Sequence, residues 1–258
     1  MKNLEQAEEL FINYTKQFDL ENIRLKQKKQ HSLRVRDISK KIAENLKLEE
    51  KDIQLATLIG LLHDIGRFEQ FTRYGTFRDR ESIDHGDLGV EILKKDNYIG
   101  EYVESEDDIN IICLAIKNHN KYQIETGLND RENQFCKIIR DADKIDIFYE
   151  ASEIFYTENE TEEINQSVIN NEIISKIYEK ELIDRNNLKE KGKLTQVLVM
   201  LAFLFDMNYV ASYEIIYQED YINKIFQRFY FKDEHTNMEM QKIQKFLKEY
   251  IKDKMQSL

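Results

Sequence analysis

Apolar side chains recur along this chain at the spacing of an α-helix. Residues 31–46 are typical, because their apolar positions fall three or four residues apart on one stripe. Residues 53–63 are apolar nearly all round, as expected of a central helix. We find no convincing set of strands. The pattern predicts helices at about 4–18, 31–46, 53–63, 84–95, 109–119, 134–148, 164–182, 194–207, 209–229 and 237–254.

Two stretches interrupt the helical pattern. Residues 67–83 mix arginines, acids and aromatic residues without a clear period, and we expect a long loop there. Residues 157–166, TENETEEINQ, are acidic and are expected to form a solvated connection. Neither stretch has the composition of a flexible linker between independent domains. The chain is therefore predicted to be a single all-α domain over residues 1–258.

Composition strengthens the helical prediction and narrows the class of protein. The chain has no proline and only eight glycines, so helix breakers are scarce. A net charge of −11 argues against broad binding to nucleic acid, although a local cluster of arginines could still hold an anionic substrate. The sequence allows a homo-oligomer but does not set an oligomeric state.

Cellular context follows from the cysteines and the apolar runs. Two cysteines without CxxC spacing are typical of reduced thiols, which favours a cytoplasmic protein. The first residues, MKNLEQAEEL, are too acidic for a signal peptide. The most apolar run, residues 197–205, is half the length of a membrane span and is expected to be a buried helix. We expect no membrane association.

Four of the five histidines lie at or near the ends of apolar helical stripes. His63 stands in LLHDIGRF, where two leucines run directly into an adjacent His-Asp pair. Burying that pair is costly unless both groups have partners. Imidazole and carboxylate together are good ligands for Mn, Fe, Ni or Zn, so a metal ion would supply the missing partner. His235 lies in a polar stretch and is expected at the surface. The four histidines at helical stripes are His31, His63, His85 and His119.

The order of these residues resembles the HD-domain metal-dependent phosphohydrolase superfamily. That family has a His, then a His-Asp doublet, then a distant Asp. Here His31 opens HSLRVRDISKKIA, the doublet lies in LLHDIGRF, and the distant Asp lies in IIRDADKIDIF. The resemblance covers about residues 25–150 and implies an all-α helical bundle. Residues of about 160–258 would form additional C-terminal helices, for which we have no family match.

The resemblance implies a metal site, and its last ligand has two candidates. His31, His63 and Asp64 would hold the ion with one further carboxylate. The helical period alone favours Asp146, whereas the family's Ala-Asp-Lys/Arg segment selects Asp143. We follow the family and choose Asp143. We expect Asp146 to contact the ligand side chains without binding the ion itself. Mg is a further candidate metal beside Mn, Fe, Ni and Zn.

His85 and His119 resemble the additional histidines of some HD subfamilies. There they either complete a two-metal centre or contact the phosphate that is cleaved. The chain lacks a paired HH segment and any Gly-Tyr-Pro motif, unlike the cyclic-di-GMP phosphodiesterase branch. We therefore expect one tightly bound ion, with both histidines at the substrate's phosphate, and leave two ions as the alternative.

Cationic side chains are expected to hold the phosphate. Arg34 lies one helical turn from His31, and Arg67 directly follows the HDIG turn at the family's basic position. The resemblance thus implies catalytic roles for Asp64, Arg67, His85 and His119, and substrate binding by Arg34, Arg67, His85 and His119. Asp84, beside His85, would either orient an imidazole or cap a helix. Aromatic residues of the 67–83 stretch would either wall a nucleobase pocket or anchor the loop.

The sequence thus predicts an enzyme, a metal-dependent phosphohydrolase that cleaves a phosphate monoester or diester of a small molecule, in particular a nucleotide. Water activated by the metal would attack directly. One alternative is a regulatory module that senses a nucleotide without turnover, but such modules usually lose a ligand, and every ligand of the basic pattern is present here. A nuclease is a further alternative, which the acidic charge disfavours.

Overall fold

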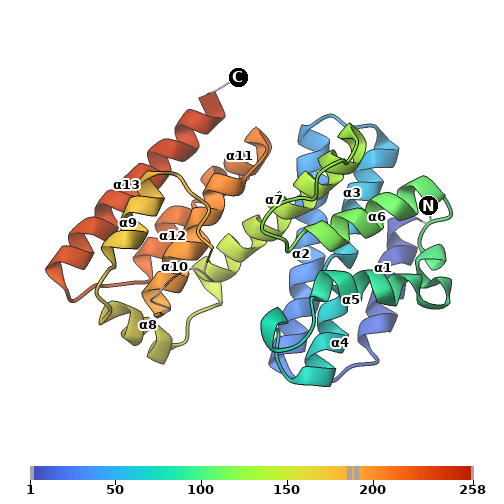
Figure 1. The fold of residues 1–258 in the computed structure, drawn as a ribbon, viewed down its shortest axis with the longest axis horizontal. Helices are drawn as coiled ribbons and strands as arrows, with labels where there is room; N and C mark the ends of the chain where they lie inside the picture. The colour runs from blue at the N-terminus through green and yellow to red at the C-terminus, as the bar shows by residue number, and fades with distance from the viewer. Residues whose placement is uncertain (1–2, 185–187, 189–191, 257–258) are drawn as a thin grey trace. The chain divides into compact units, whose positions relative to one another are not determined.

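The structure is a computed structural model that describes residues 3–184, 188 and 192–256 (Figure 1). These residues form α-helices and short 3-10 turns and contain no strand, which confirms the all-α prediction. They divide into two compact units, with the division after Asp143, inside α7. The prediction of a single domain stays a prediction.

The first unit packs its helices around a core of aliphatic and aromatic side chains. α2 packs along α3, α4 against α5, and α5 against α6. Val35 and Ile42 of the predicted stripe on α2 are fully buried, and α3 is buried along almost its whole length, as its sequence predicts. The elements are α1 Leu4–Thr15, α2 Ile23–Asn45, α3 Glu50–Leu62, α4 Ile65–Tyr74, η1 Asp79–Glu81, α5 His85–Lys94, η2 Lys95–Glu101, α6 Glu106–Asn118 and α7 Asp130–Glu153.

Two glycines let helices of this unit approach closely. A Cβ at Gly60 of α3 would lie 2.8 Å from the carbonyl oxygen of Val35 in α2. A Cβ at Gly66 of α4 would lie only 2.3 Å from the carbonyl oxygen of His85. Both contacts are with backbone, which cannot swing aside as a side chain can. Glycine is therefore required where α3 and α4 pass the helices that carry His31 and His85.

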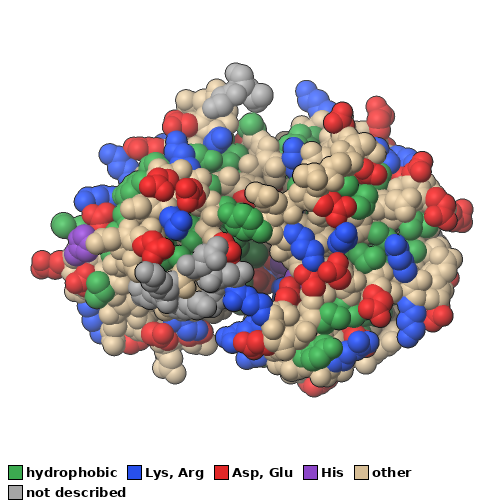
Figure 2. Space-filling model, in the orientation of Figure 1, with side chains coloured by type: hydrophobic (Ala, Val, Ile, Leu, Met, Phe, Trp, Pro, Cys, Tyr) green, Lys and Arg blue, Asp and Glu red, His purple; other side chains and the backbone are tan. Residues whose placement is uncertain are grey.

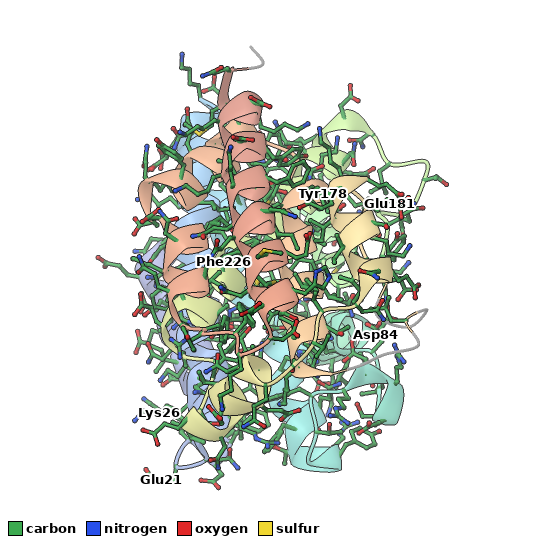
Figure 3. The ribbon with its side chains drawn as sticks, turned by 90° about the vertical axis from the view of Figure 1, so that its left-hand side faces the viewer. Glu21, Lys26, Asp84, Tyr178, Glu181 and Phe226 are labelled. Carbon is green, nitrogen blue, oxygen red and sulfur yellow. The ribbon has the colours of Figure 1, made fainter. Side chains whose placement is uncertain are left out.

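The second unit is built around its last helix. α13 packs against α9, α11 and α12. At the end of α9, the ring of Tyr178 (Figure 3) meets Phe246 of α13 edge-on, with centroids 5.1 Å apart. The elements are α8 Glu158–Asn165, α9 Asn171–Tyr178, α10 Lys193–Leu201, η4 Ala202–Asp206, α11 Val210–Gln218, α12 Tyr221–Gln227 and α13 Glu234–Gln256.

The structure corrects the two stretches predicted to be irregular. Half of residues 67–83 belongs to helix α4, which ends at Gly75 in the left-handed conformation (φ 67°). Residues 157–166 contain helix α8, because Thr157 and Glu160 form a reciprocal capping box that starts it. The acidic residues of α8 concealed this start signal. The predicted helix at 164–182 is in fact two elements, the end of α8 and α9.

The apolar run at residues 197–205 is buried, as predicted, in α10 and the 3-10 turn after it. Of the helices that the structure describes, none combines the length and the apolar character that crossing a bilayer requires.

Candidate metal centre

Four residues at helix ends and two within helices bring four histidines and two aspartates of the first unit together. His63 directly follows α3 as its C-cap residue, and Asp64 immediately precedes α4. His85 begins α5, and His119 directly follows α6 as its C-cap residue. Two further residues come from within helices: His31 from α2 and Asp143 from α7. All four histidines are buried, at most 5% exposed.

One set of donor atoms surrounds one oxygen of Asp64. Nε2 of His31 lies 3.2 Å from Nε2 of His63. Oδ1 of Asp143 lies 3.1 Å from Nε2 of His31 and 3.7 Å from Nε2 of His63. Oδ2 of Asp64 lies 3.6 and 3.7 Å from the same two nitrogens. These four side chains are the predicted metal ligands, and their donor atoms converge.

A second set faces the other oxygen of the same carboxylate. Nε2 of His85 lies 3.0 Å from Nε2 of His119. Oδ1 of Asp64 lies 3.3 Å from the first nitrogen and 3.6 Å from the second. The donor atoms of His31, His63 and Asp64 lie within 4.8 Å of one another, and so do those of Asp64, His85 and His119, which is close enough for each group to hold a metal ion. Asp64 therefore lies between two groups of donors.

The hydrogen bonds of the other ring nitrogens define the tautomers. Nδ1 of His63 lies 2.8 Å from the carbonyl oxygen of Gly60, and Nδ1 of His119 lies 2.6 Å from that of Ile116. Nδ1 of His85 lies 2.7 Å from Oδ2 of Asp79. Carbonyl and carboxylate oxygens only accept, so each of these Nδ1 atoms carries a proton, and such a ring in its neutral form has its lone pair on Nε2.

Two of these rings, those of His63 and His85, are neutral and present a lone pair from Nε2. Burial lowers the pKa of His63 to about 3 and that of His85 to about 4, so both rings are neutral at pH 7. The Nε2 atom of His85, which then carries a lone pair, lies 3.0 Å from Nε2 of His119. Imidazole nitrogens gathered in this way around a carboxylate fit a divalent metal.

The carboxylates of the centre are ionised. Burial alone would raise the pKa of Asp64, but the charge of Lys28, with a smaller contribution from Arg67, holds it well below its ordinary value. Nζ of Lys28 lies 3.0 Å from Oδ2 of Asp64. The pKa of Asp143 is also lowered, against the effect of burial, by its hydrogen bond with His31. Ionised carboxylates are the form that binds metal.

The predicted cations lie nearby but differ in their contacts. Arg67 donates from Nη1 to the carbonyl oxygen of Phe77 and to Asp79, at 2.6 and 2.9 Å. These bonds fix Arg67 to the segment after α4, and its role as a phosphate ligand stays a prediction. Arg34 is half-buried on α2, three residues after His31, and its role also stays a prediction. Asp146 is fully buried on α7.

Asp84, Lys144 and Arg140 lie beside residues of the centre in sequence or in space, and each has contacts that assign it a structural role. Asp84 caps α5 by accepting from the backbone N–H of Asp87, so the capping alternative is the one observed. Lys144 pairs with Asp206 in the second unit. Arg140 is buried and donates to the backbone carbonyls that follow α6, including those of Asn118 and Lys121 at 3.1 and 2.5 Å. This cation stabilises the helix end that carries His119.

Sequence reasoning missed two residues that touch the centre. Lys28 lies three residues before His31, on the same face of α2, and this spacing was a usable signal. Asp79 contacts His85 from the other side, and only the path of the 75–84 segment brings it there. Nothing in the sequence distinguishes Asp79 from neighbouring acids.

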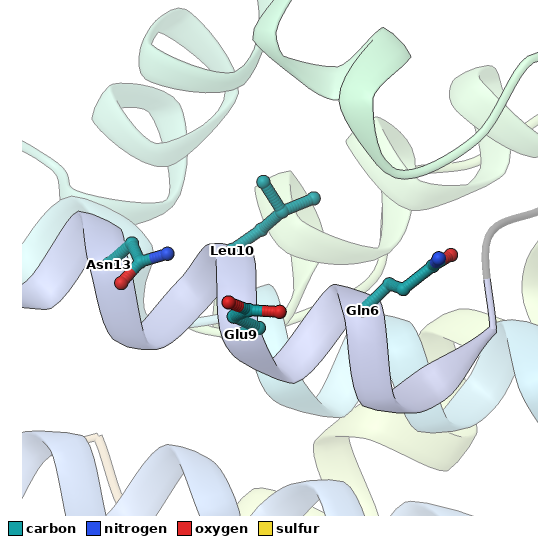
Figure 4. A pocket seen from close by; sticks show the side chains of 4 residues that line it. All are labelled: Gln6, Glu9, Leu10 and Asn13. Atoms are coloured by element: carbon teal, nitrogen blue, oxygen red, sulfur yellow. The ribbon is translucent and has the colours of Figure 1, made fainter.

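A hollow of about 310 Å³ lies elsewhere on the first unit, along α1 (Figure 4). Gln6, Glu9, Leu10 and Asn13 line it. Its single carboxylate and lack of histidine give it no donor set for a transition metal.

Known proteins match the part of the chain that holds this centre. The family model of the HD domain matches residues 29–147, a span that includes every donor from His31 to Asp143. Ribonuclease Y from Mycoplasma capricolum subsp. capricolum and from Mycoplasma mycoides subsp. mycoides SC are each 33% identical to the chain over 115 residues. The match spans 45% of this chain but only 17% of each relative's length. No solved structure matches the chain.

Proposed function

We propose that this chain, whose residues 29–147 form an HD domain of the metal-dependent phosphohydrolase superfamily, hydrolyses a phosphate ester of a nucleotide. One observation carries the proposal: two sets of histidine ring nitrogens gather at the two oxygens of one ionised, buried carboxylate, Asp64. Four buried imidazoles around one carboxylate are hard to explain as independent structural histidines. The complete donor set also favours an enzyme over a regulatory module without turnover.

His31, His63, Asp64 and Asp143 would hold a first ion. The sequence predicts one ion, with His85 and His119 at the phosphate. The tautomer of His85 favours a second ion instead, held by His85, His119 and the other oxygen of Asp64, because the neutral His85 ring with its proton on Nδ1 cannot donate from Nε2. When bound, divalent metal lowers the pKa of water and neutralises charge that develops on the phosphoryl group. Nitrogen-rich sites of this kind suit Mn, Fe, Ni or Zn better than Mg.

The chain's own side chains would bind and orient the substrate. Lys28 has its ammonium group 3.0 Å from Oδ2 of Asp64 and is 24% exposed. An anion between an ammonium group and a metal ion reduces their repulsion, so Lys28 would bind a phosphate oxygen of the substrate. The cysteines supply no nucleophile: burial raises the pKa of Cys136 to about 12, and that of Cys113 is also raised. In the proposed reaction the attacking group is water.

An aromatic ring beside the cations supports a nucleotide. Phe77 is half-buried, with Nζ of Lys28 at 5.9 Å and the guanidinium of Arg67 at 5.8 Å from its centroid. Its ring also packs against Phe71, at 4.8 Å. A partly exposed ring next to a phosphate-binding lysine suits a nucleobase. Phe68, by contrast, is fully buried and anchors α4.

Cleavage of RNA is the second candidate, because the relatives of known name are ribonucleases. Acidic and basic side chains are interspersed over the face in Figure 2, where the described residues form no continuous basic tract. With a net charge of −11, the chain is unsuited to binding a long polyanion. A small substrate is the better fit.

The test is a screen for hydrolysis by protein loaded with Mn²⁺. Nucleoside mono-, di- and triphosphates, cyclic nucleotides and a single-stranded RNA oligomer would be compared. The isosteric variant Asp64→Asn removes the shared charge and is the control, with activity expected below about 1% of wild type. A nucleotide cleaved by the wild type and not by Asp64→Asn supports the proposal. Cleavage of RNA alone favours the second candidate, and equal turnover by both proteins contradicts a role for this centre.

A further inference from the structure

Asp79 connects the metal centre to the segment that follows α4. Its Oδ2 accepts a hydrogen bond from Nδ1 of His85 at 2.7 Å. Its Oδ1 accepts from Arg67 at 2.9 Å and from Nε2 of Gln70 at 2.7 Å. Gln70 is fully buried, and its own Oε1 accepts from Arg67, at 2.9 Å. Three donors from α4 and α5, with a weaker fourth from Nδ2 of Asn120 at 3.3 Å, therefore set the orientation of the Asp79 carboxylate.

We propose that Asp79 is a positioning residue that keeps the proton of His85 on Nδ1, so that the lone pair of Nε2 points at Asp64 and His119. This inference rests on the proposed function, in which that lone pair binds a metal ion. Asp79 itself does not reach the donor set. It acts through His85, as carboxylates do that orient metal-binding histidines.

The same contacts predict what an isosteric substitution would do. Arg67 can only donate, so the atom of residue 79 that faces it must stay an oxygen. In Asp79→Asn the amide nitrogen would then take the place of Oδ2 and face His85. An N–H₂ group donates, so Nδ1 of His85 would have to accept and the proton would move to Nε2. The variant thus reverses the tautomer with almost no change in shape.

Asp84 provides a matched control for this change. It lies next to His85 in sequence, and its side chain is 31% exposed, against 29% for Asp79. Both carboxylates also accept from Nδ2 of Asn120. Asp84 instead pairs with Lys121 at 2.6 Å and caps α5, where it is labelled in Figure 3. Asn serves as a helix cap as well as Asp does, so Asp84→Asn is expected to keep the fold.

The test reads the tautomer directly, in metal-free protein, by long-range ¹H–¹⁵N correlation spectra of the histidine rings. The resonances of His85 would be assigned by their loss in His85→Gln. We expect protonated Nδ1 in the wild type and in Asp84→Asn, and protonated Nε2 in Asp79→Asn. Calorimetric titration with Mn²⁺ should then show about 10- to 100-fold weaker binding at one site in Asp79→Asn only.

The outcomes separate this inference from the proposed function. A wild-type His85 with its proton on Nε2 overturns the inference even if Asp79→Asn does not fold. The inference is also overturned if the proton of His85 stays on Nδ1 in folded Asp79→Asn. It is overturned as well if the proton moves to Nε2 in Asp84→Asn. A wild type that shows the expected tautomer but binds no Mn²⁺ contradicts the proposed metal centre and leaves the positioning role of Asp79 supported.

Discussion

Single residues decide what this centre can bind. Asp64 turns one oxygen toward each set of histidine nitrogens, and it is the only charged group shared by both sets of donors described above. His63 and His85 are neutral because burial disfavours the imidazolium form. Their backbone and carboxylate acceptors orient the lone pairs inward. A charge that is shared, and lone pairs that are fixed in direction, together make a site for cations.

Lys28 is expected to bind substrate. Lys28→Gln should raise KM about tenfold, since a charge-assisted hydrogen bond to phosphate would be lost. Lys26→Gln is the control, because Lys26 is exposed on the same helix, where it is labelled in Figure 3, and the substitution changes the net charge equally. Steady-state kinetics on the nucleotide found in the screen measures the effect. Equal KM values for Lys28→Gln and the wild type would contradict this role.

Elements of the fold position these residues by close helix contact. The Gly of the HDIG segment, Gly66, lies against the first turn of α5, so α4 holds the backbone of His85 in place. Arg140 of α7 does the same for the end of α6. The centre therefore depends on helix ends whose backbone atoms are themselves held by neighbouring helices.

Gly66→Ala is predicted to separate α4 from α5. A Cβ there would lie 2.3 and 2.8 Å from backbone atoms, which should destabilise the protein by about 1–3 kcal/mol and reduce activity. Gly89→Ala is the comparison, because its Cβ would meet side-chain methyl groups at 3.3 and 3.4 Å. Thermal unfolding of both variants distinguishes them. A Gly66→Ala protein as stable as the wild type would show that this contact is not required.

The sequence predicts features that arise from neighbouring residues better than features that arise from contacts between distant parts of the chain. The apolar stripes predict most helices because a helix is a local pattern. The His and Asp residues that converge could be selected because they lie at helix ends and resemble a known family. Helix α8 was missed although its capping box is local, since its acidic composition suggested solvent-exposed chain. Asp79 and Arg140 act through contacts that depend on tertiary packing, and no local pattern reports them.

At the scale of the whole molecule, the buried histidines link stability to pH. The pKa of His63 is about 3 and that of His85 about 4 in the folded protein, against an ordinary 6.5. Below pH 6.5 the unfolded chain therefore binds protons that the folded chain does not. Stability is complete above pH 6.5 and falls as the pH drops from there toward 4.

The prediction concerns metal-free protein between pH 7.5 and pH 5. The free energy of unfolding should fall by up to about 1.4 kcal/mol per pH unit for each such histidine. Urea denaturation at several pH values measures it. His85→Gln should reduce the slope, whereas His235→Gln, which alters an exposed residue of α13, should leave it unchanged. Stability that stays constant or rises over this range would contradict neutral buried histidines.

The metal content of the whole chain tests the central claim most directly. Wild-type protein and Asp64→Asn would be reconstituted with Mn²⁺, freed of excess ion, and analysed by mass spectrometry of the metal. We predict two ions per wild-type chain, and a loss from both sites in Asp64→Asn, because that variant removes the charge that the two donor sets share. One ion per wild-type chain would contradict the second donor set, and a wild-type chain that retains no ion would contradict the metal centre itself.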